Sequence, residues 1–434
     1  MIRVLLRRPC AVLGLLFLIN LVNYIDRQVL FALLPLIKSE FSLSDTRLGA
    51  LASAFMLVYM CAAPVVGWFA DRGSRKDFIA AGIGLWSLAT FFSGFCRGYW
   101  SLFAARAAVG VGESGYGAVS PSFVAEHFPP AARGRVLAFF SMAIPVGSAL
   151  GFALGGWIGY HHGWRAAFMV VGFPGFILAA LAYFLGDPRD ANEERSAVLS
   201  GGRETDRAFK DGALLGAVAA RPAAPGLKDY LALYRIRSYV ACTLAMAAMT
   251  FSLGGLAVWM PTFFNRFWGL DVAQGGLLFG GLTVGAGLTG SLLGGWLGDR
   301  LLRTTPKAYF LVSGAGLLAA LPLGVLAVLS PSYPLCLASL FAAELFAFLN
   351  MGPLNGVIVG VTSASVRSMA FAANIFVIHA LGDSLSPTLI GLASDRFGLK
   401  TALLGAMLAM GAAGLFCFWG ASSVADDTRE ALHA

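Results

Sequence analysis

Residues 13–36 read LGLLFLINLVNYIDRQVLFALLPL, an apolar run that contains Asp26 and Arg27 near its middle. About 20 apolar residues are enough to cross a hydrocarbon core about 30 Å thick, so this length predicts a membrane-spanning helix. An ionised Asp or Arg at the centre of such a helix costs about 2.5 to 3.5 kcal/mol on insertion scales. Charged residues at this depth usually face a bundle interior or a water-filled cavity. The stretch therefore predicts one helix of a bundle and places a candidate functional site inside it.

The rest of the chain has the same apolar character. Of its 434 residues, 58% are hydrophobic and only 12% are charged, which is far from an average soluble composition. We therefore expect a polytopic membrane protein whose partner is the lipid bilayer, and not a nucleic-acid-binding protein, despite the net charge of +8. The six cysteines are scattered singly, without metal-ligand spacing, so we expect no metal and no cofactor.

Apolar runs of about 18 residues or more, closed by charges, Pro or Gly, predict twelve spanning helices. We place them at residues 11–37, 47–70, 78–97, 100–126, 134–159, 164–186, 238–265, 273–298, 306–329, 333–361, 367–393 and 399–420. The one long polar stretch separates the first six from the last six. The predicted architecture is all-α, with two pseudo-symmetric six-helix bundles at 1–186 and 238–434 and a linker at 187–237.

A repeated sequence supports this division. Gly67-Trp-Phe-Ala-Asp71-Arg72-Gly73-Ser-Arg75-Lys76 follows the second predicted helix, and Gly295-Trp-Leu-Gly-Asp299-Arg300 follows the eighth. Weaker versions follow the fifth helix, at 155–165, and the eleventh, at 391–398. Three-helix units repeated within two six-helix halves are the arrangement of major facilitator transporters, which bind substrate near the membrane midplane between the halves.

Basic residues are concentrated on one side of the predicted membrane. Most Lys and Arg lie in the N-terminal segment, in the loops after even-numbered helices and in the central linker. By the positive-inside rule, both termini and the linker are then cytoplasmic. The short loops and the lack of a targeting tail favour a bacterial inner membrane.

The segment at 67–76 is predicted to be a loop, and it resembles motif A of the major facilitator superfamily. Its charged side chains can pair with facing carboxylates and helix ends on the cytoplasmic side. We expect such contacts to hold the cytoplasmic gate shut in the outward-facing state. The alternative is that these charges only set the topology. The predicted gating residues are Asp71, Arg72, Arg75 and Lys76, with Asp299 and Arg300 in the second half.

The fourth predicted helix carries Arg106 and Glu113 in a stretch similar to the superfamily's motif B. The two residues are seven apart, so they project from one helix face about 10 Å apart along the axis. Because a buried carboxylate can bind and release a proton as its neighbours change, Asp26 and Glu113 are both candidate proton carriers. Arg27 and Arg106 are candidate substrate-binding cations. The alternative is a purely structural ion pair between Arg106 and Asp26.

Further polar residues complete the candidate substrate site. Asn23 lies one turn before Arg27 on the same helix face. In the second half, Glu344 lies in the tenth helix, and His379 and Asp383 lie in the eleventh, four residues apart. Such a pair can share a hydrogen bond along one helix face, although a packing role for the histidine remains the alternative.

Three segments together resemble the spinster family. They are Asn23-Tyr-Ile-Asp26-Arg27, Arg106-Ala-Ala-Val-Gly-Val-Gly-Glu113-Ser and Leu381-Gly-Asp383-Ser-Leu-Ser386-Pro387-Thr-Leu-Ile-Gly391. This resemblance implies transport of lysolipids or sphingoid phosphates, with proton coupling in some members. It also implies that Asp26, Arg27, Arg106 and Glu113 are functional positions.

We therefore expect a proton-coupled transporter of an amphipathic anionic lipid that acts as a monomer by alternating access. The Asn23 to Arg27 stretch also resembles organic-anion symporters of the same superfamily, so a small organic anion is the alternative substrate. We find no Ser-His-acid spacing and no HExxH motif, and we predict no catalytic residues and no enzyme activity.

Overall fold

A computed structural model of the chain describes residues 6, 8–117, 119–186, 227–363 and 366–433. The first 40 residues of the predicted linker, 187–226, lie outside this description, as does the side chain of Asp71. The described residues are helical and contain no β-strand, which confirms the all-α expectation.

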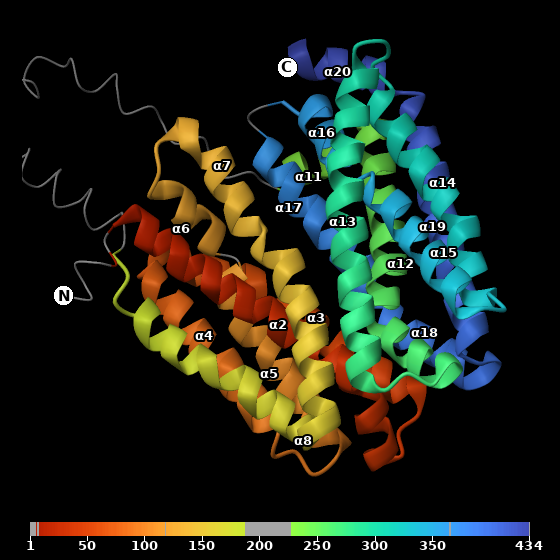
Figure 1. Cartoon of the computed structure of the whole chain (residues 1–434). Helices are drawn as coiled ribbons and strands as arrows, with labels where there is room; N and C mark the ends of the chain where they lie inside the picture. The colour runs from red at the N-terminus through yellow and green to blue at the C-terminus, as the bar shows by residue number, and fades with distance from the viewer. Residues whose placement is uncertain (1–5, 7, 118, 187–226, 364–365, 434) are drawn as a thin grey trace, which may run out of the picture.

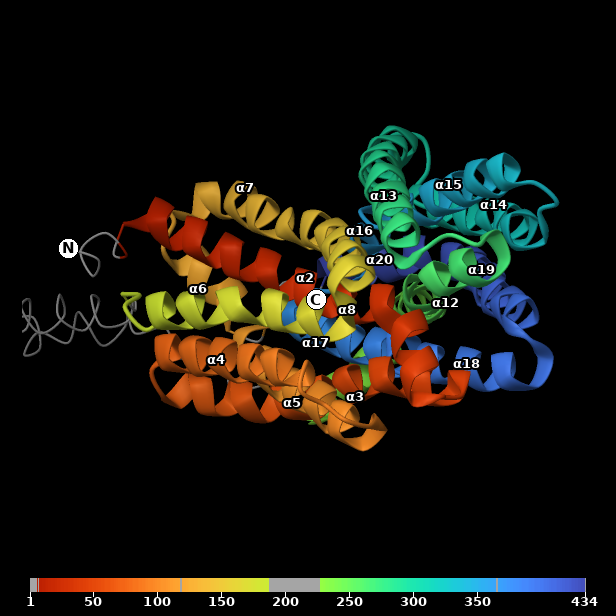
Figure 2. The same cartoon turned by 60° about the horizontal axis from the view of Figure 1, so that its bottom comes forward.

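Each of the twelve predicted segments contains helix (Figures 1 and 2). The part before the linker, which we call the first half, contains α2 (Pro9–Phe41), α3 (Asp45–Arg72), α4 (Arg75–Ser93), α5 (Tyr99–Gly117), α6 (Ser120–Glu126), α7 (Pro130–Ser141) and α8 (Ala143–Ala182). The part after it, the second half, contains α11 (Leu227–Leu233), α12 (Arg237–Trp268), α13 (Val272–Leu302), α14 (Ala308–Leu329), α15 (Tyr333–Phe348), α16 (Pro353–Val361), α17 (Arg367–Ile378), the π-helix η1 (His379–Asp383), α18 (Ser386–Phe397), α19 (Leu399–Ala421) and α20 (Val424–His433). The short helices α11 and α20 were not expected.

Several predicted helices are interrupted or joined. The fifth and sixth segments share the long helix α8, whose one non-helical residue is Gly163, with φ 82° and ψ 158°. Only glycine adopts such a conformation without strain, so this residue is where the chain turns between the two segments. The tenth segment divides into α15 and α16, and the eleventh into α17, η1 and α18.

The prediction of a loop at 67–76 is wrong. Helix α3 continues through Arg72, and only Gly73 and Ser74 separate it from α4, which begins at Arg75. The prediction ended the helix at its first charges, but a helix that leaves the bilayer keeps its hydrogen bonds and continues into water.

Glycines of α8 bring it close to α2. A Cβ at Gly147 would lie 2.7 Å from the backbone oxygen of Leu21, and one at Gly151 would lie 2.6 Å from that of Ile25. Side chains at these two positions would overlap the α2 backbone, so the regular glycine spacing sets the approach of the two helices. The four-residue spacing puts both glycines on the face of α8 that packs against α2.

The two halves meet at the end of the molecule where α2 ends and α3 begins, toward the bottom of Figure 1. We call this the closed end. Glycines permit the contact here too: a Cβ at Gly49 of α3 would overlap the backbone oxygen of Pro387, and one at Gly276 of α13 would overlap that of Phe152. Direct backbone contact between the halves therefore depends on small residues in both of them.

Hydrogen bonds between the halves gather at the closed end, around a group we call the Asp45 cluster. Asp45 accepts from both Nη atoms of Arg266, at 2.7 Å and 2.5 Å, and from the hydroxyl of Ser394 at 2.5 Å. Lys38 of the first half donates to Asp45 at 2.5 Å. Asp395 accepts from the backbone N–H of Asp45 at 2.8 Å. Ser394 and Asp395 belong to the weak repeat at 391–398, which thereby joins the halves.

Candidate functional site

Two adjacent residues of α2 pair with two residues of α5. The Nε of Arg27 donates to Oε2 of Glu113 at 2.6 Å, and Nη1 of Arg106 donates to Oδ1 of Asp26 at 3.4 Å. Arg106 and Glu113 share one face of α5, as their seven-residue spacing predicts. Because Asp26 and Arg27 are about 100° apart around α2, each reaches a different partner on that face.

The pair of Asp26 and Arg106 lies in a buried polar network. Nη2 of Arg106 donates to the hydroxyls of Thr90 at 3.0 Å and Ser93 at 3.3 Å, and Thr90 in turn donates to Asp26. Both charged side chains are only 2% exposed, and the guanidinium of Arg106 lies 5.0 Å from the Phe168 ring centre. A buried ion pair with further hydrogen bonds of this kind fixes the geometry of the three helices α2, α4 and α5.

Arg27 has a different environment. Its guanidinium carbon lies 5.0 Å, 4.9 Å and 5.4 Å from the ring centres of Tyr24, Phe55 and Tyr59, which supply cation–π contacts. The Arg27 side chain is 17% exposed, whereas that of its partner Glu113 is fully buried. Of the two buried arginines, Arg27 is therefore the one that a ligand can reach.

Asn23 is 2% exposed and lies beside Glu113, one turn before Arg27. Thr90 and Ser93 were not predicted as site residues, although two hydroxyl residues three apart in the apolar α4 are a recognisable signal. The three aromatic rings around Arg27 were not predicted either. Two of these, Phe55 and Tyr59, come from α3, and nothing in the sequence showed that this face of α3 lies against Arg27.

His379 and Asp383 form the polar group of the second half. The Nδ1 of His379 lies 2.9 Å and 3.1 Å from the two carboxylate oxygens of Asp383, and the side chains are 28% and 23% exposed. They bound the π-helix η1, where Gly382 leaves helical geometry at φ −93° and ψ −107°. A Cβ at Gly254 of α12 would lie 2.7 Å from the Cβ of Asp383. Single π-turns within α-helices often occur at functional sites.

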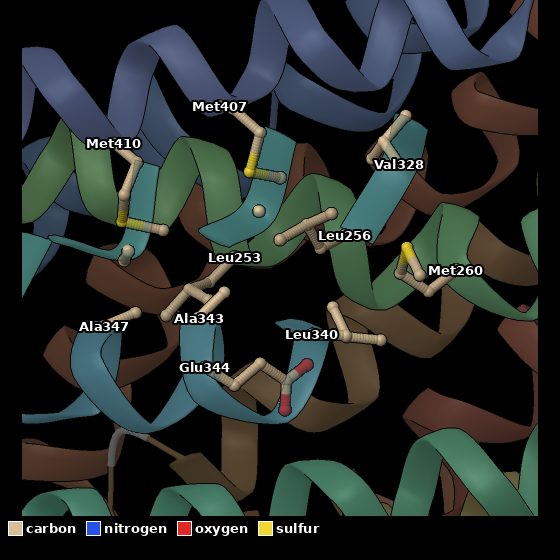
Figure 3. A pocket seen from close by; sticks show the side chains of 12 residues that line it. Leu253, Leu256, Met260, Val328, Leu340, Ala343, Glu344, Ala347, Met407 and Met410 are labelled. Atoms are coloured by element: carbon tan, nitrogen blue, oxygen red, sulfur yellow. The ribbon is translucent and has the colours of Figure 1, made fainter. Parts of the chain in front are cut away.

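Glu344 lies apart from these groups. It is 3% exposed and borders a small apolar cavity enclosed by α12, α14, α15 and α19 of the second half (Figure 3). The structure therefore does not bring Glu344 together with Arg27 or Arg106.

Two of the predicted gating residues of the first half, Arg72 and Arg75, have partners within that half. Arg75 donates to Glu126 at 2.6 Å, and Arg72 donates to the backbone oxygen of Trp68 at 3.0 Å while lying over its ring. Lys76 is half-buried. A role for these residues in closing a gate between the halves stays a prediction.

The corresponding residues of the second half are similarly placed. Asp299 accepts a hydrogen bond from the hydroxyl of Tyr309 at 2.9 Å, and the guanidinium of Arg300 lies 5.4 Å from the Trp296 ring centre. Asp299 and Arg300 are both exposed at the end of α13. Their gating role also stays a prediction.

Comparison with known proteins shows the family of the chain. A family model described as Major Facilitator Superfamily matches residues 16–387. The chain is 32% identical over 408 residues to protein spinster homolog 1 of Xenopus laevis, covering 90% of this chain and 74% of that protein. It is 33% identical over 415 residues to protein spinster homolog 1 of Homo sapiens, with the same coverage of 90% and 74%. The chain belongs to the spinster family of the major facilitator superfamily.

The fold of this spinster-family protein is similar to that of a solved relative. The structure is that of a bacterial homolog to the human lysosomal transporter Spinster, in an inward-facing and unoccupied conformation. The TM-score is 0.77 at 22% identity, with 98% of both chains covered. Within the described residues, nine helices are long and apolar enough to cross a membrane. The protein is thus an integral membrane protein whose family and fold are those of transporters.

Proposed function

We propose that this spinster-family protein moves an amphipathic anionic lipid, of the lysophospholipid or sphingoid phosphate type, by proton-coupled alternating access. The observation that carries the proposal is the contact of Arg27 with Glu113, in which a partly exposed cation is paired with a fully buried carboxylate. A phosphate head group and Glu113 would compete for the same guanidinium.

This competition links substrate to protons. While Glu113 is ionised, it balances the charge of Arg27 and weakens the attraction of Arg27 for an anion. A proton on Oε2 of Glu113 removes that balance, and the positive charge of Arg27 becomes available to the head group. Asp26 is the second candidate carrier, but its network with Arg106, Thr90 and Ser93 favours a role in holding Arg106 in place.

The second half supports an amphipathic substrate. We propose that His379 and Asp383, with Asn23 in the first half, contact the polar part of the ligand. The surrounding helices of the second half are strongly apolar, and α14 and α19 have no charged residue in their central turns. An apolar chain therefore finds more favourable surroundings there than in the first half. A small organic anion remains the second candidate, because the polar pair at η1 would suit a compact hydrophilic solute.

We further propose that the closed end faces the outside of a bacterial inner membrane and that both termini are cytoplasmic. The conformation would then be open toward the cytoplasm. In the opposite conformation, Asp71, Arg72, Arg75 and Lys76 would form contacts between two six-helix bundles, at 1–186 and 238–434, joined by the linker 187–237. We expect a monomer to be sufficient for transport.

Ligand-dependent thermal stabilisation of the purified protein tests the substrate. A lysophosphatidate should raise the melting temperature of the wild-type protein, whereas gluconate, a small organic anion, should not. Arg27→Gln should abolish the effect because it removes the charge, and Arg27→Lys should reduce it because an ammonium lacks the planar fork. Arg303→Gln is the control, since Arg303 is exposed at the end of α13.

Stabilisation by gluconate alone would favour the small-anion function. An Arg27→Gln variant that is stabilised by lysophosphatidate as strongly as the wild type would overturn the proposed role of Arg27.

A further inference from the structure

The strongest unexplained feature of the second half is the buried carboxyl group of Glu344. Its Oε1 accepts a hydrogen bond from the Thr283 hydroxyl at 3.2 Å, while Oε2 finds no hydrogen-bond partner among the described residues. An ionised carboxylate in such surroundings would be desolvated, and no described residue pairs a positive charge with it to offset this. These contacts therefore favour the neutral, proton-bound form of Glu344.

The cavity beside Glu344 is lined by apolar side chains. Leu340 and Ala343 of its own helix flank it, and Met407 of α19 and Leu256 of α12 line the same cavity (Figure 3). The polar group that acts on the carboxyl is the Thr283 hydroxyl of α13. The titratable or charged residues of the neighbouring helices lie elsewhere along them, at Arg237, Tyr239, Cys242 and Arg266 in α12, Asp299 and Arg300 in α13, Tyr309 in α14, Tyr333 and Cys336 in α15, and Lys400 and Cys417 in α19.

Thr283 connects Glu344 to the contact between the halves. Helix α13 packs against α8 of the first half, where a Cβ at Gly280 would lie 3.0 Å from the backbone oxygen of Ala149. Thr283 is one turn beyond Gly280. It is also half-buried, so the side chain that donates to Glu344 is itself partly exposed. A shift of α13 against α8 would therefore move the one hydrogen-bond donor of Glu344 and change the access of water to it.

We propose that Glu344 is a proton-binding site of the second half, filled in this conformation and emptied when α13 moves as the halves rearrange. The step is a simple dissociation: the carboxylic acid gives its proton to water and becomes a carboxylate, which keeps the hydrogen bond from Thr283. This deepens the proposed function, because it rests on proton-coupled alternating access and adds a proton site remote from Arg27. Glu344 thereby leaves the set of expected substrate-binding residues.

Transport in proteoliposomes tests the coupling. The probe is a fluorescent lysophosphatidate, and the driving force is a gradient of about one pH unit, which sustains about tenfold accumulation per coupled proton. Glu344→Gln mimics the protonated form, so exchange of probe across the membrane should persist while gradient-driven accumulation falls by about tenfold. Glu430→Gln, on the exposed face of α20, and Thr283→Ser, which keeps the hydroxyl, should behave as the wild type.

A second measurement needs no substrate. Spin labels at Ser39→Cys and Arg396→Cys, both exposed at the closed end, report the distance between the halves in a background without native cysteines. The distance distribution of the reference protein should change with pH, and Glu344→Gln should remove one step of that titration. Equal titrations of the two proteins, or no change with pH in the reference, would overturn the proposal. Failure of the lysophosphatidate to bind would instead count against the proposed function. The pH titration of the label distance would still test the role of Glu344, because it needs no substrate.

Discussion

Arg106 and Asp26 show what a membrane interior requires of a charged residue. Each is almost completely buried, and each has a charged partner together with hydroxyl groups of α4. An ion pair of this kind is weak evidence for stability, because an apolar replacement of both partners is often as stable. Removing one partner is different, since it leaves the other charge buried and unpaired.

Asp26→Asn should therefore destabilise the protein by about 3 to 5 kcal/mol, because it leaves the charge of Arg106 unpaired. The double variant Asp26→Asn with Arg106→Gln should recover most of this loss. Thermal unfolding in detergent, followed by tryptophan fluorescence, measures both. If the single variant unfolds at the same temperature as the double variant, the network contributes no such constraint.

At the scale of the element, glycine positions decide how the helices pack. Gly147 and Gly151 of α8 face α2 within the first half, whereas Gly276 and Gly280 of α13 face α8 across the halves. The first contact stays within one half, but the second lies where the halves would slide or separate in the proposed alternating access. Close backbone approach makes such an interface well defined in one arrangement and easily disturbed by one methyl group.

Gly276→Ala should loosen the closed end, because its Cβ would overlap the backbone oxygen of Phe152. Overpacking of this kind typically costs about 1 to 3 kcal/mol, so the separated arrangement gains population. Gly281→Ala is the matched control on the same helix, since nothing lies within 4 Å of its Cβ. Label distances between Ser39→Cys and Arg396→Cys should widen only in the first variant. Equal widening in both variants would point to a general effect of alanine on α13.

For the molecule as a whole, the Asp45 cluster holds one end shut. Asp45 receives hydrogen bonds from Arg266 and Ser394 of the second half, and Lys38 of the first half adds a second charged contact. In the proposed alternating access, this cluster would break in the opposite conformation. Its strength therefore sets part of the balance between the two arrangements.

Asp45→Asn should shift the protein toward the arrangement that is open at this end. A hydrogen bond to a charged group contributes about 1.5 to 3 kcal/mol, so loss of even one changes the ratio of the two arrangements by about tenfold or more. Asp271→Asn is a suitable control, because Asp271 lies at the same end but only caps α13. The same label pair measures the shift. An unchanged distance distribution in Asp45→Asn would show that the backbone contacts alone hold the end closed.

The sequence by itself determined the twelve helical segments, because the length needed to cross a bilayer is a one-dimensional property. It also singled out Asp26, Arg27, Arg106 and Glu113, since charges in apolar helices must face the protein interior. Helical periodicity placed Arg106 and Glu113 on one face, as the structure confirms. The predicted helix end in the segment 67–76 was wrong, because the end of an apolar run does not mark the end of a helix.

Only the tertiary structure decided the partners. Periodicity fixes which side chains share a face of one helix, but the crossing of two helices decides which face meets which. That is why the pairing of Arg27 with Glu113, the hydroxyl groups around Arg106 and the isolation of Glu344 emerged only from the fold. The role of the repeat at 391–398 also emerged only from the fold. Its Asp395 joins the halves because α18 of the second half packs against α3 of the first half.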